Sequence, residues 1–287
     1  VNGEEKLLVA TTGGVFEIRD NKVKKVIDNQ IALQLFQSKI EPNQLFVGLA
    51  DGFGHLKYDK KKKSWDKFER NDSIKNSIKS IYETEEGTIY LGAWAAGIIK
   101  LNNPDDPKPL AIDTVQGLPL DGTEYAVSKI NNNLVISCQK GLFKYNEQTN
   151  KVDTIKNWGI NFTEAGLGIY KILNVKNGYW LSLYSNDKKK GRWAGVYRFL
   201  ETESKDSFII DRAFSKTIPQ VAAYSLFEDG NFFWIANDKG VYKFDNTKKV
   251  NYKAPYNLNI LKVTTSFNGK DSTLFNGTFY EKRDSII

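Results

Sequence analysis

The feature that most constrains the fold is a hairpin sequence that recurs along the chain. Its clearest copy covers residues 231–245 (NFFWIANDKGVYKFD), in which an aromatic strand breaks at residues 237–240 and a second strand returns. Alternating apolar and polar residues with glycine in the connection predict a β-hairpin. Copies of this hairpin lie near residues 7–20, 45–59, 89–102, 134–146, 179–199, 233–245 and 272–282. Such self-similarity indicates a repeat architecture.

Each repeat holds more than the hairpin. A glycine marks the start of the returning strand, at Gly14, Gly54, Gly97, Gly141, Gly195, Gly240 and Gly277. From the second copy onward a short apolar run precedes the hairpin, and turn pairs such as Asn177-Gly178 and Asp229-Gly230 connect the two. A weaker, charged segment follows each hairpin. We therefore expect four short antiparallel strands in every repeat.

Four antiparallel strands in about 40–45 residues predict a propeller blade. The expected fold is all-β, a single seven-bladed β-propeller of four-stranded antiparallel blades over residues 1–287. Aromatic residues such as Phe46, Tyr90 and Trp180 are expected between neighbouring blades, and the innermost strands are expected to line a channel. Only six residues precede Leu7, too few for an inner strand and a turn, and methionine is absent. These features suggest a fragment of a longer chain, or an imperfectly closed ring.

Charge and hydropathy narrow the classes of partner. The chain has 41 Lys and Arg residues against 34 Asp and Glu residues, a net charge of +7. The lysine runs at 60–63, 188–190 and 248–249 fall in predicted turns on separate blades, which favours solvated loops over a nucleic-acid track. No run approaches the roughly 18 apolar residues that span a membrane. We predict neither nucleic-acid binding nor membrane insertion of this segment. Its one cysteine, Cys138, excludes an internal disulfide.

The repeat resembles the two-component regulator propeller repeat, in which an inner strand precedes D-G-N-L-W-I-G-T-x-x-G-L-x-x-Y/F-D. Residues 228–245 (EDGNFFWIANDKGVYKFD) match almost in full, and residues 85–102 (EEGTIYLGAWAAGIIKLN) match well. The QGLP sequence at 116–119 is similar to the GLP that often leads into such a blade. The resemblance covers essentially the whole chain, one blade after another.

This resemblance implies a function as well as a fold. Propellers of this family usually form the extracytoplasmic, ligand-sensing part of bacterial histidine kinases and hybrid sensors, and many respond to polysaccharide fragments. The chain is thus expected to be periplasmic or extracellular, to bind a small molecule or oligosaccharide, and to self-associate in a receptor dimer. Fold alone does not establish function. The alternatives are a stand-alone protein-interaction scaffold or secreted binding protein, and a propeller-type carbohydrate-active enzyme.

The sequence contains no recognisable catalytic or metal-binding motif. Its one histidine, His55, falls in a predicted hairpin connection, and no serine stands in a nucleophile-elbow context. One histidine and one cysteine provide no zinc motif, and no segment matches an EF-hand loop. We predict no catalytic residues, no metal and no cofactor, although an enzyme that uses scattered Asp, Glu, Tyr and Lys stays open.

Candidate ligand-binding residues come from loops between second and third strands, which gather on one face of a propeller. The loops at 50–55 and 184–193 depart from the short pattern of the others, and the loop at 92–97 carries an indole. Tryptophan can stack on a sugar face, and arginine can hold an anionic group. The proposed pocket is formed by His55, Trp94, Arg192 and Trp193. The alternative is that Trp193 caps a blade edge and residues 188–190 form a solvated loop tip.

Overall fold

The computed structural model consists almost entirely of short β-strands. It describes residues 6–120, 122, 124–185, 195–203, 207–211, 223–237, 239–247, 262–267 and 270–276. The chain divides into two compact units, Val1–Asn246 and Thr247–Ile287, and each is considered separately. No helix among the described residues is long and apolar enough to cross a membrane.

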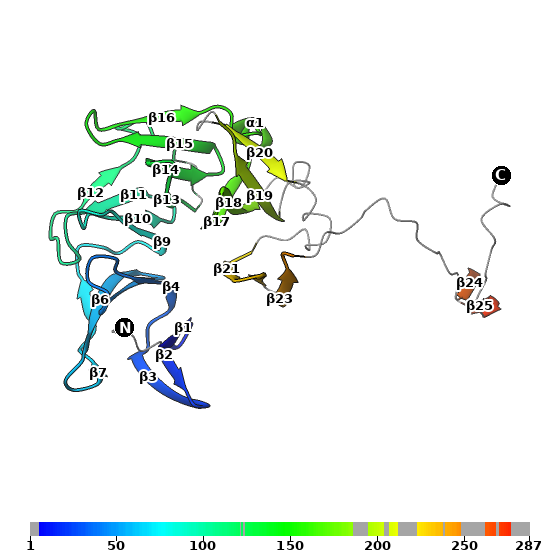
Figure 1. The fold of residues 1–287 in the computed structure, drawn as a ribbon, viewed down its shortest axis with the longest axis horizontal. Coiled ribbons are helices and arrows are strands. Elements are labelled where there is room, and N and C mark those ends of the chain that lie inside the picture. The colour runs from blue at the N-terminus through cyan, green and yellow to red at the C-terminus, as the bar shows by residue number, and fades with distance from the viewer. Residues whose placement is uncertain are drawn as a thin grey trace. The chain divides into compact units, whose positions relative to one another are not determined.

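The first unit contains six antiparallel sheets in sequence order, which we number as blades 1 to 6 (Figure 1). Blade 1 contains β1 (Leu7–Thr11), β2 (Gly14–Arg19) and β3 (Lys22–Asp28), and blade 2 contains β4 (Ala32–Gln37), β5 (Gln44–Leu49), β6 (Gly52–Asp59), β7 (Ser64–Trp65) and β8 (Glu69–Asn71). Blade 3 contains β9 (Ile78–Glu83), β10 (Ile89–Ala93), β11 (Gly97–Leu101) and β12 (Leu110–Ile112), and blade 4 contains β13 (Ala126–Ile130), β14 (Asn133–Cys138), β15 (Gly141–Asn146) and β16 (Lys151–Ile155). Blade 5 contains β17 (Gly168–Val175), β18 (Gly178–Tyr184), β19 (Gly195–Glu201) and β20 (Phe208–Asp211), after a single turn of helix, α1 (Phe162–Ala165); blade 6 contains β21 (Ser225–Asp229), β22 (Phe232–Asn237) and β23 (Gly240–Asp245).

The all-β propeller prediction is confirmed, but the prediction of seven blades was wrong, because the structure has six. The seventh repeat contributes β24 (Lys262–Phe267) and β25 (Lys270–Asn276), which pair with each other in a two-stranded sheet of the second unit. These are the inner and second strands expected there, and the predicted hairpin end at 277–282 lies outside the described residues. A hairpin motif specifies local strand pairing, whereas a blade also needs neighbouring sheets to cover its faces. Counting motifs therefore overestimated the number of blades.

Not every blade has four regular strands. The described sheet of blade 1 begins with the strand at Leu7 and has three strands. In blade 2 the outer position is divided, because β7 and β8 pair with different parts of β6. The turn glycine of this blade also differs from our prediction: Gly52 begins β6, and Gly54 lies within the strand.

The turn glycines elsewhere have a steric reason. Gly14 begins β2 with φ of 135°, a backbone conformation that L side chains rarely adopt. A Cβ atom at this position would also lie 2.0 Å from the carbonyl oxygen of Ile27 on the next strand. The glycine signal in the repeat therefore reports a real backbone requirement.

Among the described residues, the core consists of five apolar clusters, one at each junction between successive blades from 1 to 6. Between blades 5 and 6, for example, the rings of Trp180 and Phe233 stack with centroids 4.2 Å apart. The predicted packing of Phe46, Tyr90 and Trp180 is confirmed, since all three are almost completely buried in these clusters. A twisted sheet needs a partner on each face, and the neighbouring blade provides it.

A small residue near the end of each second strand lets the next blade approach. At Gly92, a Cβ atom would lie 2.0 Å from the carbonyl oxygen of Tyr125 in the next blade. Blades 4 and 5 have serine at this position, and its hydroxyl accepts a backbone N–H from the following blade. These bonds are Ile169 N–H to Ser137 Oγ and Ala223 N–H to Ser182 Oγ, each 2.7 Å. The repeat thus encodes contacts between blades as well as the hairpin.

Candidate functional site

The first strands of blades 2 to 5 (β4, β9, β13 and β17) lie on the inner side of the propeller (Figure 1), and their side chains line a channel. One cavity in it has a volume of about 680 Å³ and is lined by residues of all four strands. A second cavity of about 450 Å³ shares Gln34, Ser80, Ala126, Tyr170 and Lys171 with the first. The two cavities are therefore adjoining parts of one channel.

Lys171 lies where the two cavities meet. Its Nζ donates a hydrogen bond to Gln34 Oε1, which comes from the inner strand of blade 2. Burial lowers the pKa of Lys171 to about 8, and the nearby carboxylate of Glu124 opposes this effect. Since Gln34 is neutral, the hydrogen bond satisfies the amine without balancing its charge.

Other lysines line the channel. In the larger cavity, Lys129 forms an ion pair of 3.2 Å with Glu85, whereas Lys39 Nζ lies 5.2 Å from the centroid of the Tyr82 ring. Among the described residues, neither Lys39 nor Lys171 forms an ion pair with a carboxylate. The larger cavity thus contains more cationic than anionic side chains.

The smaller cavity contains an ion pair and an aromatic wall. Lys79 forms an ion pair with Glu124 and also lies over the indole of Trp94, 4.7 Å from its centroid. Tyr170 packs against Tyr184 at a centroid distance of 4.3 Å, and burial raises the pKa of Tyr170 to about 12. A tyrosine packed against a second ring and beside polar groups is suited to contact with an amphipathic ligand such as a sugar ring.

The predicted site residues fall in different places. Trp94 lies in the β10–β11 turn, and 46% of its surface is exposed. His55 is not in a hairpin connection as predicted: it lies within β6, is 4% exposed and contacts Gln44, Glu69 and Asp105. Arg192 and Trp193 lie outside the described residues, so the pocket of four residues stays a prediction.

Lys171, Gln34 and Tyr170 were not among the site residues predicted from the sequence. The apolar run before the fifth hairpin was expected to form an inner strand, and inner strands were expected to line the channel. A lysine in an otherwise apolar inner strand was therefore an available signal, because such a charge is costly to bury without a function or partner. Its partner Gln34 could not be identified, since the two residues are far apart in the chain.

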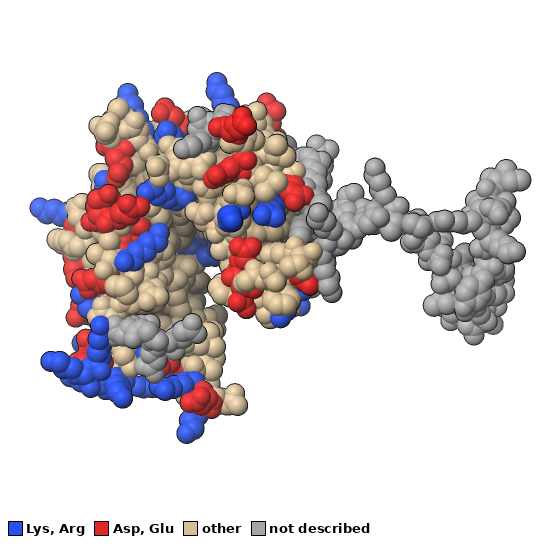
Figure 2. All heavy atoms as spheres, viewed as in Figure 1, with Lys and Arg blue, Asp and Glu red and all other residues tan. Residues whose placement is uncertain are grey.

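A second basic region lies on the surface of blades 1 and 2. Figure 2 shows Lys and Arg side chains gathered at the lower left, where Figure 1 places β3 and β7. The lysines of this region include Lys22, Lys24 and the run at 60–63, all of which are exposed. Water screens exposed charges strongly, so these lysines contribute less to specific recognition than the largely buried amine of Lys171 in the channel. The channel is the stronger candidate site.

No family model and no curated protein sequence matches the chain. Several solved structures, however, are similar to the chain in fold. The extracellular domain of a putative one-component system from B. thetaiotaomicron is 18% identical, with a TM-score of 0.63 over 86% of this chain and 31% of that one. The extracellular domain of a putative hybrid two-component system from B. thetaiotaomicron is 16% identical, with a TM-score of 0.57 over 95% and 37%.

Similarity of fold extends beyond these signalling proteins. A chain in the nidogen/laminin complex is 9% identical, with a TM-score of 0.53 over 84% of this chain and 89% of that one. By contrast, this chain spans about a third of the length of the two bacterial domains. At these identities the similarity establishes the fold, and the chain is a β-propeller similar in fold to the extracellular domains of bacterial one- and two-component systems.

Proposed function

We propose that this propeller is a non-catalytic, ligand-sensing module of an extracytoplasmic bacterial receptor, and that its ligand is an anionic, saccharide-like molecule bound in the channel. The observation that carries the proposal is a cavity of about 680 Å³ lined by four inner strands, into which Lys39 and Lys171 contribute ammonium groups. Ligand sites are typically concave and present a few convergent polar groups. In the receptor the module would act as the input domain, within a dimer.

The two bacterial structures support this context. Each is the extracellular domain of a putative signalling system, and the repeat motif resembles the propellers of such receptors. The same comparison supports a location in the periplasm or outside the cell. At these sequence identities the two structures support the fold and the context, so the proposal rests mainly on the channel.

The charge of the channel favours an anionic group on the ligand. Burial lowers the pKa of Lys171, and a carboxylate or sulfate beside its Nζ would stabilise the charged amine. Lys39 lies in the same cavity, and its ammonium group is held over Tyr82. Two cations and an aromatic wall match the carboxylate and ring faces of an acidic sugar.

The proposal can be tested by thermal unfolding in the presence of neutral, carboxylated and sulfated oligosaccharides. A ligand that binds only the folded chain raises the unfolding midpoint. We expect an acidic oligosaccharide to do so, and Lys171→Met or Lys39→Met to reduce the shift. Lys144→Met is the matched control, because Lys144 is an exposed residue of β15 outside both cavities.

Three outcomes would contradict the proposal. If no oligosaccharide shifts the midpoint, or if both channel variants respond as the wild type does, the channel is not the ligand site. A protein that binds a rim or blade edge would then support the interaction-scaffold alternative. If an oligosaccharide is cleaved during the assay, the carbohydrate-active enzyme becomes the better description.

A further inference from the structure

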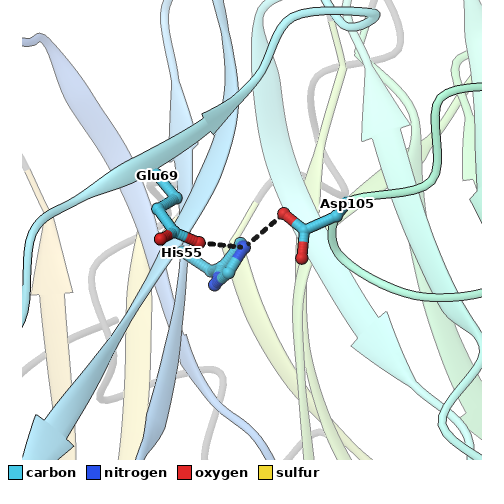
Figure 3. Close-up of side chains that lie close together, drawn as sticks. All are labelled: His55, Glu69 and Asp105. Atoms are coloured by element: carbon cyan, nitrogen blue, oxygen red, sulfur yellow. Dashed lines mark hydrogen bonds and ion pairs between the residues drawn. The ribbon is translucent and has the colours of Figure 1, made fainter.

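The imidazole of His55 faces two carboxylates at the junction of blades 2 and 3 (Figure 3). Its Nε2 lies 2.7 Å from Asp105 Oδ1 and 3.7 Å from Glu69 Oε2. One ligand atom from each residue can be chosen so that all three lie within 4.8 Å of one another. This cluster is outside the channel and has no part in the function proposed above.

Strand register and a braced loop bring the three residues together. His55 and Glu69 are direct partners across the β6–β8 pairing. Asp105 comes from the connection between β11 and β12 in blade 3, and Asn71 holds this connection by donating Nδ2–H bonds to the carbonyl oxygens of Pro104 (2.9 Å) and Asp106 (3.0 Å). The site is therefore built from two blades before any ion arrives.

The cluster carries local negative charge that a bound cation would balance. Glu69 and Asp105 contribute two negative charges, and among the described residues neither carboxylate forms an ion pair with lysine or arginine. The His55 side chain is 6% exposed, whereas the carboxylate side chains of Glu69 and Asp105 are 66% and 65% exposed. A buried nitrogen ligand thus lies beneath two oxygen ligands that are open to solvent, an arrangement that an ion can enter.

We propose that His55 Nε2 and one carboxylate oxygen each from Glu69 and Asp105 bind a divalent cation of the zinc class. Imidazole suits zinc and its transition-metal neighbours, whereas calcium and magnesium prefer sites made of oxygen alone. With metal–ligand bonds of about 2.1 Å, tetrahedral ligands lie about 3.4 Å apart. The separations of 2.7 and 3.7 Å lie on either side of this spacing, and the chosen oxygens of the two carboxylates lie within 4.8 Å of each other, so side-chain movements would complete the site. Water fills the remaining coordination position.

Gln44 orients the imidazole from behind. Its side-chain nitrogen lies 3.2 Å from His55 Nδ1, which is the arrangement expected when Nε2 carries the proton and donates to Asp105. Metal binding needs the other tautomer, in which Nδ1–H donates and Nε2 is free. A half-turn of the Gln44 amide presents Oε1 to Nδ1–H, and a hydrogen bond of this kind is typical behind a metal-binding histidine.

The test uses the full chain after metal has been removed with a chelator. We expect close to one equivalent of zinc to bind in competition with a chromophoric chelator, and cobalt(II) to give the intense visible absorption of a tetrahedral site. Glu69→Gln and Asp105→Asn are each expected to weaken zinc binding at least ~100-fold, and Gln44→Leu roughly 10- to 100-fold, the usual range for a residue behind the ligands. The two carboxylates are largely exposed, so their amide variants should fold.

Asp72→Asn is the matched control, because this exposed aspartate is close to β8 in sequence but outside the cluster. It should bind zinc as the wild type does. Zinc should also raise the unfolding midpoint of the wild type and Asp72→Asn, but not of Asp105→Asn. The inference is overturned if Asp105→Asn binds zinc as tightly as Asp72→Asn, or if cobalt(II) gives no tetrahedral absorption. The three residues would then be a hydrogen-bonded cluster only.

Discussion

The junction between blades 4 and 5 and the facing edges of blades 1 and 6 are built from the same kind of strand but have different surroundings. At the junction, Leu181 and Phe199 are almost completely buried in one apolar cluster. At the edges, Leu7 and Phe227 are 59% and 60% exposed and line a cavity of about 860 Å³. Among the described residues, no buried apolar cluster joins blade 1 to blade 6. The comparison shows that a blade sequence determines a sheet, whereas a neighbour determines whether its face becomes core.

The largest expected loss of stability comes from removing a buried side chain at the junction between blades 4 and 5. Phe199→Ala should lower the free energy of unfolding by about 3–5 kcal/mol, because it removes a buried ring and leaves a cavity. Urea denaturation would measure this loss. Phe227→Ala is the matched change at the exposed edge, and equal losses from the two substitutions would refute the contrast between the regions.

A smaller change in the free energy of unfolding should come from Lys171, which places a charged amine in the channel. Burial lowers its pKa from 10.5 to about 8. Below pH 8 the amine is charged in both the folded and the unfolded chain, so the cost of burying the charge is present in full. Between pH 8 and 10.5 the folded chain has lost a proton that the unfolded chain retains, and stability from this group rises with pH.

Lys171→Met should remove this pH dependence and stabilise the chain near pH 7 by up to roughly 3 kcal/mol, since each unit of pKa difference corresponds to about 1.4 kcal/mol. Chemical denaturation of both proteins from pH 7 to 10 would give the difference, and the two stabilities should converge as pH rises. A constant difference across this range would show that the Lys171 amine does not titrate as described.

The smallest expected effect is at the exposed edge. Leu7→Ser should change the free energy of unfolding by less than about 0.5 kcal/mol, because the side chain is already largely in water. Thermal unfolding would detect a larger change. A loss above about 2 kcal/mol would mean that this edge is covered in solution, and that blade 1 has a partner on its open face.

Much of the local structure could be predicted from the sequence. The hairpins with Gly14, Gly97 and Gly141 at the start of the returning strand lie where they were expected. The predictions were wrong where one local sequence fitted two structures. The glycines at 52 and 54 both fit a turn, and the turn was placed at the second. His55 was therefore assigned to the connection between strands, whereas it lies within β6. The burial of His55 depends on blade 3, which the residues around it do not specify.

The candidate sites were much less predictable than the strands. Gln34 and Lys171 meet across the channel, and Glu69 and Asp105 approach one imidazole from different blades. Neither grouping has a motif spacing, so a search for metal or catalytic motifs could not find it. The residues come together because separate blades pack against one another.

By itself, the sequence determined that this protein is a β-propeller of short antiparallel strands, because turn chemistry and alternating hydrophobicity act within a few residues of the chain. Only the tertiary structure decided that six blades form, that Lys171 is enclosed in a channel and that His55 faces two carboxylates. These outcomes depend on which surfaces exclude water from each other. That is a property of blades in contact, and no single repeat contains it.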